Sequence, residues 1–207
     1  MKWLANPPRG TQIVVGFDGS DSDDWTALRG QTRSGRQFTP RYGPDRRPTI
    51  WNPAEWGGQV PRREVHLAVL EVHDRWSVAR GYYDPFGWWS EIGTWAEEIG
   101  ADKVIEWPTN RDKAMFEAIK RFEVDLRTGA ITHDGCPLTT QAVANSRRVP
   151  RPGQRYGLGK PHGEYHRKID PAIASILADE AAGDATAADA WDETTREEIS
   201  HVMYGFN

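Results

Sequence analysis

The sequence of 207 residues contains little cysteine and no long apolar run. Cys136 is its single cysteine, so no disulfide can form within the chain, which is typical of proteins from a reducing cytoplasm. No apolar run approaches the roughly 18 residues that a membrane-spanning helix needs. The first ten residues, MKWLANPPRG, lack the apolar core of a signal peptide. These absences predict a soluble intracellular protein.

A nucleotide-binding phosphate loop is also missing. Gly157–Pro161 has a superficial likeness to G-x-x-x-x-G-K-[ST], but its spacing is wrong and a proline stands where Ser or Thr is needed. His133 and Cys136 have the spacing of metal ligands, yet no second pair completes a zinc site. The chain is therefore not expected to hydrolyse ATP or to hold structural zinc.

Positive and negative charges are concentrated in separate stretches, although the net charge is only −4. Residues 29–63 contain eight arginines and two acids, and residues 147–168 contain seven Lys or Arg and one acid. Residues 179–198 reverse the balance, with eight acids and one base. Local patches decide phosphate binding, so each basic stretch is a candidate for contacting DNA. A solvated surface is the commoner explanation of such a run.

The hydrophobic pattern alternates between strands and helices, which predicts one layered α/β domain. Strands are expected at residues 12–17, 25–32, 77–83 and 104–107. Helices are expected at residues 61–76, 88–99, 115–126, 138–146 and 169–182. Pro61 should be the first residue of its helix, and a hairpin or loop should fill residues 33–60. Residues 147–160 should be extended or looped, and the acidic, Ala-rich C-terminus should add a last helix.

Three aspartates stand where a catalytic site can form. Asp18 ends the first strand, Asp84 ends a later strand, and Asp170 opens the helix near the C-terminus. Sites in open α/β sheets form outside the carboxyl ends of strands, and converging carboxylates need a cation between them. Two Mg²⁺ or Mn²⁺ ions at such oxygen ligands can activate water and stabilise the leaving oxygen of a phosphodiester. Asp-Gly turns and Asp-Pro helix caps explain the same residues without any chemistry.

Three segments, in this order, resemble the acidic motifs of the nuclease domain of tailed-phage terminase large subunits: IVVGFDGSDSDDWTAL, GYYDPFGWWSEIGTWAEE and HRKIDPAIASILADEA. The stretch ITHDGCPLTTQAVANSRRVPR resembles the segment that joins the second motif to the third. The resemblance covers about residues 3–182. It implies a ribonuclease-H-like fold, with a central mixed β-sheet flanked by α-helices, similar to Holliday-junction resolvases and retroviral integrases.

The resemblance also implies roles for individual residues. Asp18, Asp84 and Asp170 match the acids that bind two divalent metal ions, Mg²⁺ or Mn²⁺, with Asp18 bridging both. Because Pro171 follows Asp170, that aspartate is expected at the helix cap rather than in the first turn, which leaves its reach to the metals open. Asp24 and Lys168 are auxiliary candidates. The residues expected to contact the DNA backbone are Arg147, Arg148, Arg151, Arg155, Lys160 and Arg167.

The sequence therefore predicts a metal-dependent endonuclease that cuts double-stranded DNA during phage genome packaging. The partners that the resemblance implies are the phage portal, the small terminase subunit and an ATPase domain. The implied location is the host bacterial cytoplasm, on the procapsid. Residues 1–10 are expected to be the remnant of a linker from the missing ATPase domain, and residues 11–207 the nuclease domain. The chain would then be an excised fragment or the product of a split gene.

Two other functions remain open at this point. A Holliday-junction resolvase or an integrase-like strand-transfer enzyme would have the same fold, and selective cutting of four-way junctions would distinguish it. A non-catalytic module that docks onto the packaging motor would keep the fold without binding metal.

Overall fold

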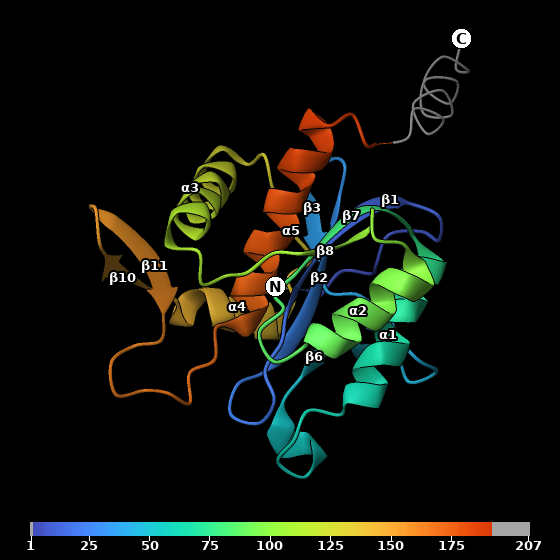
Figure 1. Cartoon of the computed structure of the whole chain (residues 1–207), viewed down its shortest axis with the longest axis horizontal. Coiled ribbons are helices and arrows are strands. Elements are labelled where there is room, and N and C mark those ends of the chain that lie inside the picture. Colours follow the sequence, from blue (N-terminus) through green and yellow to red (C-terminus); the bar gives the residue numbers. More distant parts are fainter. Residues whose placement is uncertain (1, 192–207) are drawn as a thin grey trace.

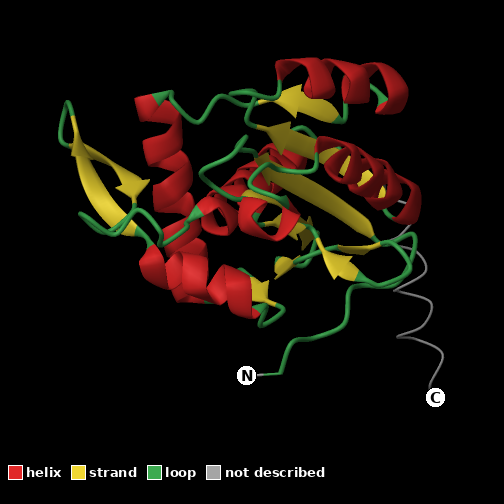
Figure 2. Ribbon diagram, turned by 90° about the horizontal axis from the view of Figure 1, so that it is seen from below, coloured by secondary structure: helices red, strands yellow, loops and turns green. Residues whose placement is uncertain are grey.

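The computed structural model describes residues 2–191, which form a central β-sheet with helices on both faces (Figures 1 and 2). The main path of the sheet has the strand order β8-β7-β1-β2-β3-β9, and β6 pairs with β2 beside it. The strands of this sheet are β1 (Gln12–Asp18), β2 (Thr26–Thr32), β3 (Arg36–Phe38), β6 (Ile50–Trp51), β7 (Ser77–Tyr83), β8 (Val104–Glu106) and β9 (Thr132–His133).

The sheet is mixed, as expected. β1 pairs in parallel with β7, which pairs in parallel with β8. On its other side β1 pairs antiparallel with β2, and β2 pairs antiparallel with β3. The carboxyl ends of β1, β7 and β8 therefore meet at one edge of the sheet.

Five helices surround this sheet: α1 (Arg62–Arg75), α2 (Trp89–Ile99), α3 (Asp112–Thr128), α4 (Pro137–Asn145) and α5 (Asp170–Ala187). One face is covered by α1 and α2, and α5 crosses the opposite face and packs in turn against α3 and α4. Two small antiparallel pairs complete the described fold: β4 (Arg41–Tyr42) with β5 (Arg47–Pro48), and β10 (Arg147–Arg151) with β11 (Arg155–Gly159). The β10–β11 hairpin projects beyond the sheet in both ribbon views.

The β1 strand is buried on both faces because its side chains alternate between two cores. Ile13, Val15 and Phe17 pack in the core under α1 and α2, while Val14 packs in the core under α5. A Cβ atom at Gly16 would lie 2.2 Å from the carbonyl oxygen of Ala174 in α5. Only glycine therefore allows α5 to cross β1 at this short distance.

Several details differ from the sequence-based expectations. Pro61 occupies the capping position before α1 rather than its first turn. Leu126 was expected on the buried face of α3 but is 41% exposed. The helix expected at residues 169–182 runs to Ala187, and it is buried on several faces because α3, α4 and the sheet all pack against it. Its many alanines permit this close packing.

The other expected strands and helices are present where the structure describes the chain, with bounds that differ by at most three residues. The strands at residues 12–17, 25–32 and 77–83 are present within one residue, and residues 147–160 are extended as the β10–β11 hairpin. None of the described helices has the length and apolar character needed to cross a membrane. The expected C-terminal helix falls mainly on residues 192–207, which lie outside the described residues.

Candidate active site

The parallel pairing of β1 with β7 places Asp18 and Asp84 beside each other. Phe17 is opposite Tyr83 in this register, so each aspartate follows at the carboxyl edge of the sheet. The amide nitrogen of Asp84 donates a 2.9 Å hydrogen bond to the carbonyl oxygen of Phe17. The main chain itself therefore fixes the spacing of these two acids.

Asp170 approaches the same edge of the sheet from α5, the helix that crosses one face of the sheet. It is the first residue of α5, and Ile169 occupies the capping position with φ −126° and ψ −3°. The expectation that Asp170 lies at the helix cap is therefore wrong, since it belongs to the first turn. Pro171 is compatible with this position because the amide groups of a first turn have no partner within the helix.

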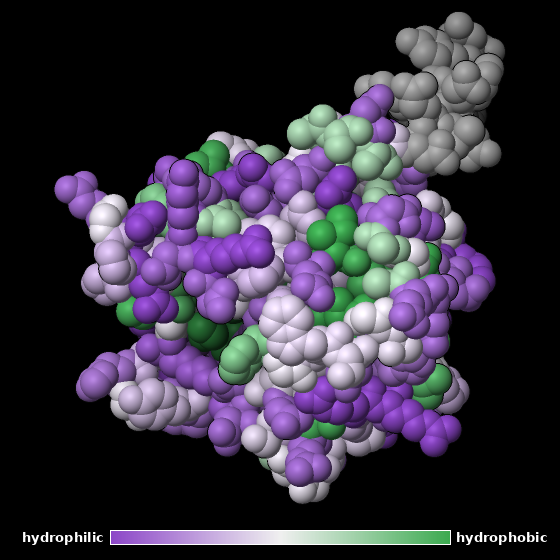
Figure 3. All heavy atoms as spheres, viewed as in Figure 1, coloured by the Kyte–Doolittle hydropathy of each residue, from purple (hydrophilic) through white to green (hydrophobic). Residues whose placement is uncertain are grey.

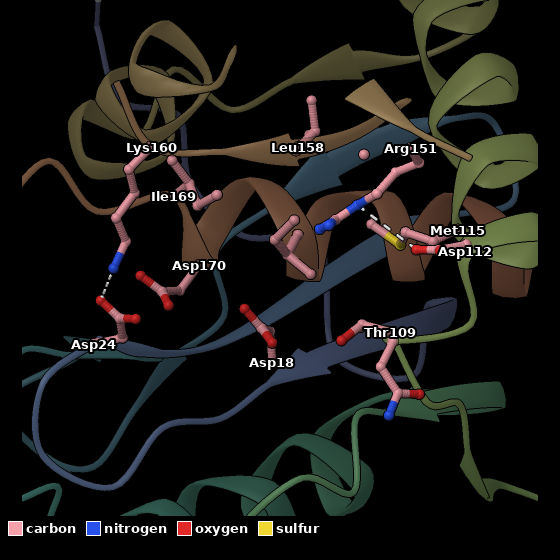
Figure 4. A pocket seen from close by; sticks show the side chains of 13 residues that line it. Asp18, Asp24, Thr109, Asp112, Met115, Arg151, Leu158, Lys160, Ile169 and Asp170 are labelled. Atoms are coloured by element: carbon pink, nitrogen blue, oxygen red, sulfur yellow. Dashed lines mark hydrogen bonds and ion pairs between the residues drawn. The ribbon is translucent and has the colours of Figure 1, made fainter. Parts of the chain in front are cut away.

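A cavity of about 470 Å³ lies between β1, the start of α5, α3 and the β10–β11 hairpin. The carboxylates of Asp18 and Asp170 project into the same space, one from β1 and the other from α5 (Figure 4). The other polar side chains that line the cavity are Asp24, Thr109, Asn110, Asp112, Arg151 and Lys160.

Burial and the acids in and beside this cavity raise the pKa values of Asp18 and Asp170. Burial, together with the charges of Asp170, Asp84 and Asp24, raises the pKa of Asp18 well above its ordinary value. Burial, followed by the charge of Asp24, raises the pKa of Asp170 to about 6. The Oδ2 atom of Asp170 is buried and has no hydrogen-bond partner. This crowding of carboxylates, with one oxygen left without a partner, fits a hard divalent cation such as Mg²⁺ or Mn²⁺.

The carboxylates of the candidate site do not converge on one point. As they stand, no group of three or more His, Cys, Asp or Glu residues within residues 2–191 forms a complete site for a metal ion. Asp84 is 6% exposed and is not among the residues that line the cavity, although its charge acts on Asp18. Its Oδ1 accepts a 3.2 Å hydrogen bond from the backbone nitrogen of Thr109, and its Oδ2 accepts a 2.8 Å bond from the Thr109 hydroxyl.

Sequence reasoning did not identify Thr109. The residue follows β8, whose parallel pairing with β7 brings it to the edge that carries Asp84. A polar residue just after a third parallel strand is a signal of the same kind as the two strand-ending aspartates. A search for any polar residue, and not only for acids, just after the strand expected at residues 104–107 identifies Thr109 from the sequence.

Asp24 and Lys168, the two auxiliary candidates, contact each other. The ammonium group of Lys168 lies 2.8 Å from Asp24 Oδ1, and that of Lys160 pairs with the same oxygen. Although burial raises the pKa of Asp24, hydrogen bonds from these two lysines outweigh burial and lower it. Asp24 thus stands in the cavity as an ionised group held by two cations.

The six basic residues expected at the DNA backbone are distributed between the cavity and its surroundings. Arg151 and Lys160 line the cavity, and Arg151 Nε lies 3.6 Å from Asp112 Oδ1. Arg147, Arg148 and Arg155 extend the basic surface along the hairpin, where Figure 3 shows hydrophilic side chains gathered. Arg148 is paired with Glu123 of α3 at 2.5 Å. The sixth residue, Arg167, is exposed and pairs with Glu164.

Arg29 contradicts the hypothesis that all of residues 29–63 present arginines to DNA. Its side chain is fully buried, 3.6 Å from the carboxylate of Asp134, and its Nε donates a 3.1 Å hydrogen bond to the hydroxyl of Ser175. The cause is its place on the central strand β2, under α5. A count of charges along the sequence does not distinguish such a buried cation from a surface cation.

Several known phage proteins are similar to this chain. The gene 13 protein of Mycobacterium phage D29 is 31% identical over 185 residues, which cover 84% of this chain but only 30% of that protein. The HK97 bacteriophage large terminase superimposes with a TM-score of 0.64 and 17% identity, over 87% of this chain and 41% of that one. The large terminase nuclease of phage G20c with bound magnesium gives a TM-score of 0.59 and 12% identity, over 84% of each chain.

No family model matches the sequence. The chain spans about a third of the length of the curated phage relative described above. The large terminase nuclease of phage G20c, by contrast, is covered to 84% of its length, and at 12% identity its likeness to this chain is one of fold. The chain therefore has the ribonuclease-H-like α/β fold of the nuclease domain of phage large terminases.

Proposed function

We propose that this chain is a metal-dependent endonuclease that hydrolyses double-stranded DNA during the packaging of a phage genome. The observation that carries the proposal is the pair of carboxylates, Asp18 and Asp170, that project into one cavity with raised pKa values. Groups with perturbed pKa values in a cleft are typical of functional sites. The fold supports the same activity, because its solved neighbours are terminase nucleases and one of them holds magnesium.

Asp18, Asp84 and Asp170 would hold two divalent ions, Mg²⁺ or Mn²⁺. When bound, such ions supply an activated water and stabilise the leaving 3′ oxygen. Asp18 is suited to the bridging position because both other acids act on its pKa. Thr109 orients Asp84 by contacting each of its carboxylate oxygens once, which leaves further lone pairs available.

The basic residues would hold the DNA backbone beside the acids. Lys160 and Arg151 would contact phosphates close to the cut. The other arginines of the hairpin, Arg147, Arg148 and Arg155, would contact phosphates further along. Such contacts position DNA without reading its sequence. Asp24 would serve as an auxiliary group that holds Lys160 and Lys168 near the cavity. Arg167 would add a further contact to the DNA backbone.

The chain would work as one part of a larger packaging machine. Its match covers only 30% of the D29 gene 13 protein and 41% of the HK97 large terminase, so both of those proteins carry further sequence. We infer that an ATPase domain, the phage portal and the small terminase subunit are its partners, at the procapsid in the bacterial cytoplasm.

A plasmid assay tests the proposal directly. Supercoiled DNA incubated with the chain in Mn²⁺ or Mg²⁺ should be nicked and then linearised, and EDTA should stop the reaction. Soaking a crystal in Mn²⁺ should give anomalous density beside Asp18 and Asp170. Preferential cutting of a four-way junction over linear duplex would instead indicate a resolvase, and failure to bind any metal would indicate a non-catalytic docking module.

A further inference from the structure

Two large aromatic side chains lie exposed in the segment that directly follows Asp84. Phe86 is 77% exposed and Trp89 is 57% exposed, although most large apolar side chains of the described chain are buried. Both belong to the segment that follows Asp84, only two and five residues along the chain. Single exposed apolar side chains are ordinary on protein surfaces, but these two rings lie three residues apart in one segment beside a candidate catalytic acid.

The segment that carries these aromatic residues is held firmly. Trp88, which lies between them in sequence, is fully buried, and its indole nitrogen donates a 3.3 Å hydrogen bond to the carbonyl oxygen of Ser20. Gly87 has φ 74°, a conformation that turns the chain between Phe86 and Trp88. The exposed rings therefore stand on a rigid support, and little conformational entropy would be lost when they bind a partner.

Arg62 ties this support to the loop that follows β1. Its guanidinium group donates 2.8 Å and 2.9 Å hydrogen bonds to the carbonyl oxygen of Gly87 and to Asp21 Oδ1. It also pairs with Glu91 at 2.5 Å and lies 4.4 Å above the Trp88 ring. One cation thus joins the segment after Asp84 to the segment after Asp18.

The same place offers a favourable position for a phosphate. Trp89 is the first residue of α2, and no side chain caps the amide groups of this first turn. The amino-terminal end of a helix carries a partial positive charge and favours anions. Aromatic faces beside such an end match the two parts of a nucleotide, a base to stack and a phosphate to bind.

We infer that Phe86 and Trp89 form a stacking surface for the exposed face of a DNA base beside the cutting site. This inference rests on the proposed function, because DNA is its ligand. The interior of an intact duplex has no free base face, but a duplex end and a locally opened segment both have one. Stacking of a base on an aromatic side chain is sequence-tolerant because every base has a π-face.

The surface is tested by equilibrium binding without cutting. Affinities would be measured by fluorescence anisotropy in EDTA for four DNAs: a fully paired minicircle, the same minicircle with a mismatched bubble, a blunt linear duplex, and a duplex with a single-stranded extension. The Phe86→Ala, Trp89→Ala double variant should bind the bubble or the end-containing DNAs roughly 10-fold more weakly than the wild type. Its affinity for the fully paired minicircle should stay the same. Loss on the bubble identifies opened duplex as the source of the base, and loss on the linear DNAs identifies the end.

Control variants separate stacking from a general loss of structure. Leu67→Ala removes an apolar side chain of α1 that is 48% exposed, and it should bind all four DNAs like the wild type. The variant with Phe86→Tyr and Trp89→Phe keeps two aromatic faces and should restore binding. A 2-aminopurine placed at the free or unpaired position should be quenched by the wild type, by Leu67→Ala and by this restored variant, but not by the double alanine variant.

Equal weakening on all four DNAs, or no weakening on any, would overturn the stacking surface. No weakening together with loss of a dimer in sedimentation would assign the two aromatic residues to a contact between copies of the chain. The nuclease proposal is judged separately by plasmid cutting in Mn²⁺. If the protein does not cut but the double variant loses affinity for the bubble or the ends, the stacking surface stands and the nuclease proposal fails. If the protein cuts but the double variant binds all four DNAs like the wild type, the nuclease proposal stands and the stacking surface fails.

Discussion

The acids and the bases of the candidate site are held in different ways. Asp18 and Asp170 belong to β1 and α5, which cross each other in the core, and the main chain fixes their positions. The arginines of the β10–β11 hairpin stand on a two-stranded sheet outside the core, where Arg148 and Arg151 pair with acids of α3. The difference indicates that the acids set the geometry of the site, which a single substitution destroys. The bases attract the DNA backbone, and this attraction is shared among several residues.

The largest expected effect is on the acids. Asp18→Asn and Asp170→Asn keep side-chain volume but remove a charge needed to hold cations, so plasmid cutting in Mn²⁺ should fall by roughly 10²-fold or more. Melting temperature in EDTA should not fall, because each change relieves repulsion between carboxylates. Asp45→Asn, in the segment between β4 and β5, is the control and should cut normally. Full activity of Asp170→Asn would remove that residue from the site.

The next effect tests whether the core sets the position of the acids. Gly16→Ala introduces a Cβ that would lie 2.2 Å from one backbone atom of α5 and 2.3 Å from another, so α5 must move. Overpacking of this kind costs about 1–3 kcal/mol, and the melting temperature should fall by several degrees. Cutting should decline more than stability alone explains. Gly93→Ala, where an added Cβ meets open space, should leave cutting unchanged.

A smaller loss is expected on the basic side. Changing Arg147, Arg148 and Arg151 together to alanine should weaken binding to all DNA sequences alike. The log–log dependence of affinity on salt should become shallower by about 0.9 for each phosphate contact that is lost. Arg9→Ala, which changes an exposed arginine outside both basic stretches, is the control. A loss confined to one DNA sequence would show base recognition and contradict a role limited to phosphates.

The smallest effect concerns an acid of α5 outside the cavity. Burial raises the pKa of Asp179 to about 6, although a hydrogen bond from Gln31 lowers it. The folded protein therefore holds this proton more tightly than the unfolded chain, whose aspartates titrate near 3.9. The stability that the neutral form contributes is fully present below about pH 4 and is lost as the pH rises through about 6.

Asp179→Asn should remove this pH dependence. The amide keeps an acceptor for Gln31 and carries no charge, so at pH 8 it should stabilise the fold by on the order of 2 kcal/mol. This corresponds to a rise of roughly 4 °C in melting temperature for a chain of this size. At pH 4 the variant and the wild type should melt together. An equal rise at both pH values would exclude titration of Asp179 as the cause.

The sequence alone indicated the strands and the order of the acids, because these depend on local patterns. Asp18 and Asp84 each follow an apolar run rich in β-branched or aromatic residues, and each is followed by Gly or Pro. Such runs identify a buried strand and its end without knowledge of its neighbours.

Features that depend on contacts between distant segments could not be predicted in this way. Arg29 looks like the other arginines of its stretch, and only the packing of α5 on β2 reveals that it is buried. Thr109 follows a strand that the sequence does indicate, but only the pairing of β7 with β8 shows that it contacts Asp84. The expected position of Asp170 is wrong by one residue because a proline is accepted at the first and at the second position of a helix alike.

The contact between Gly16 and α5 has a consequence for how the site tolerates change over evolution. Backbone atoms of the two elements meet there, so the separation of Asp18 from Asp170 does not depend on which side chains fill the surrounding core. Substitutions in that core alter the free energy of unfolding before they alter this separation. The spacing of the two carboxylates in this chain is therefore set by the main chain, and it tolerates changes among the apolar side chains around it.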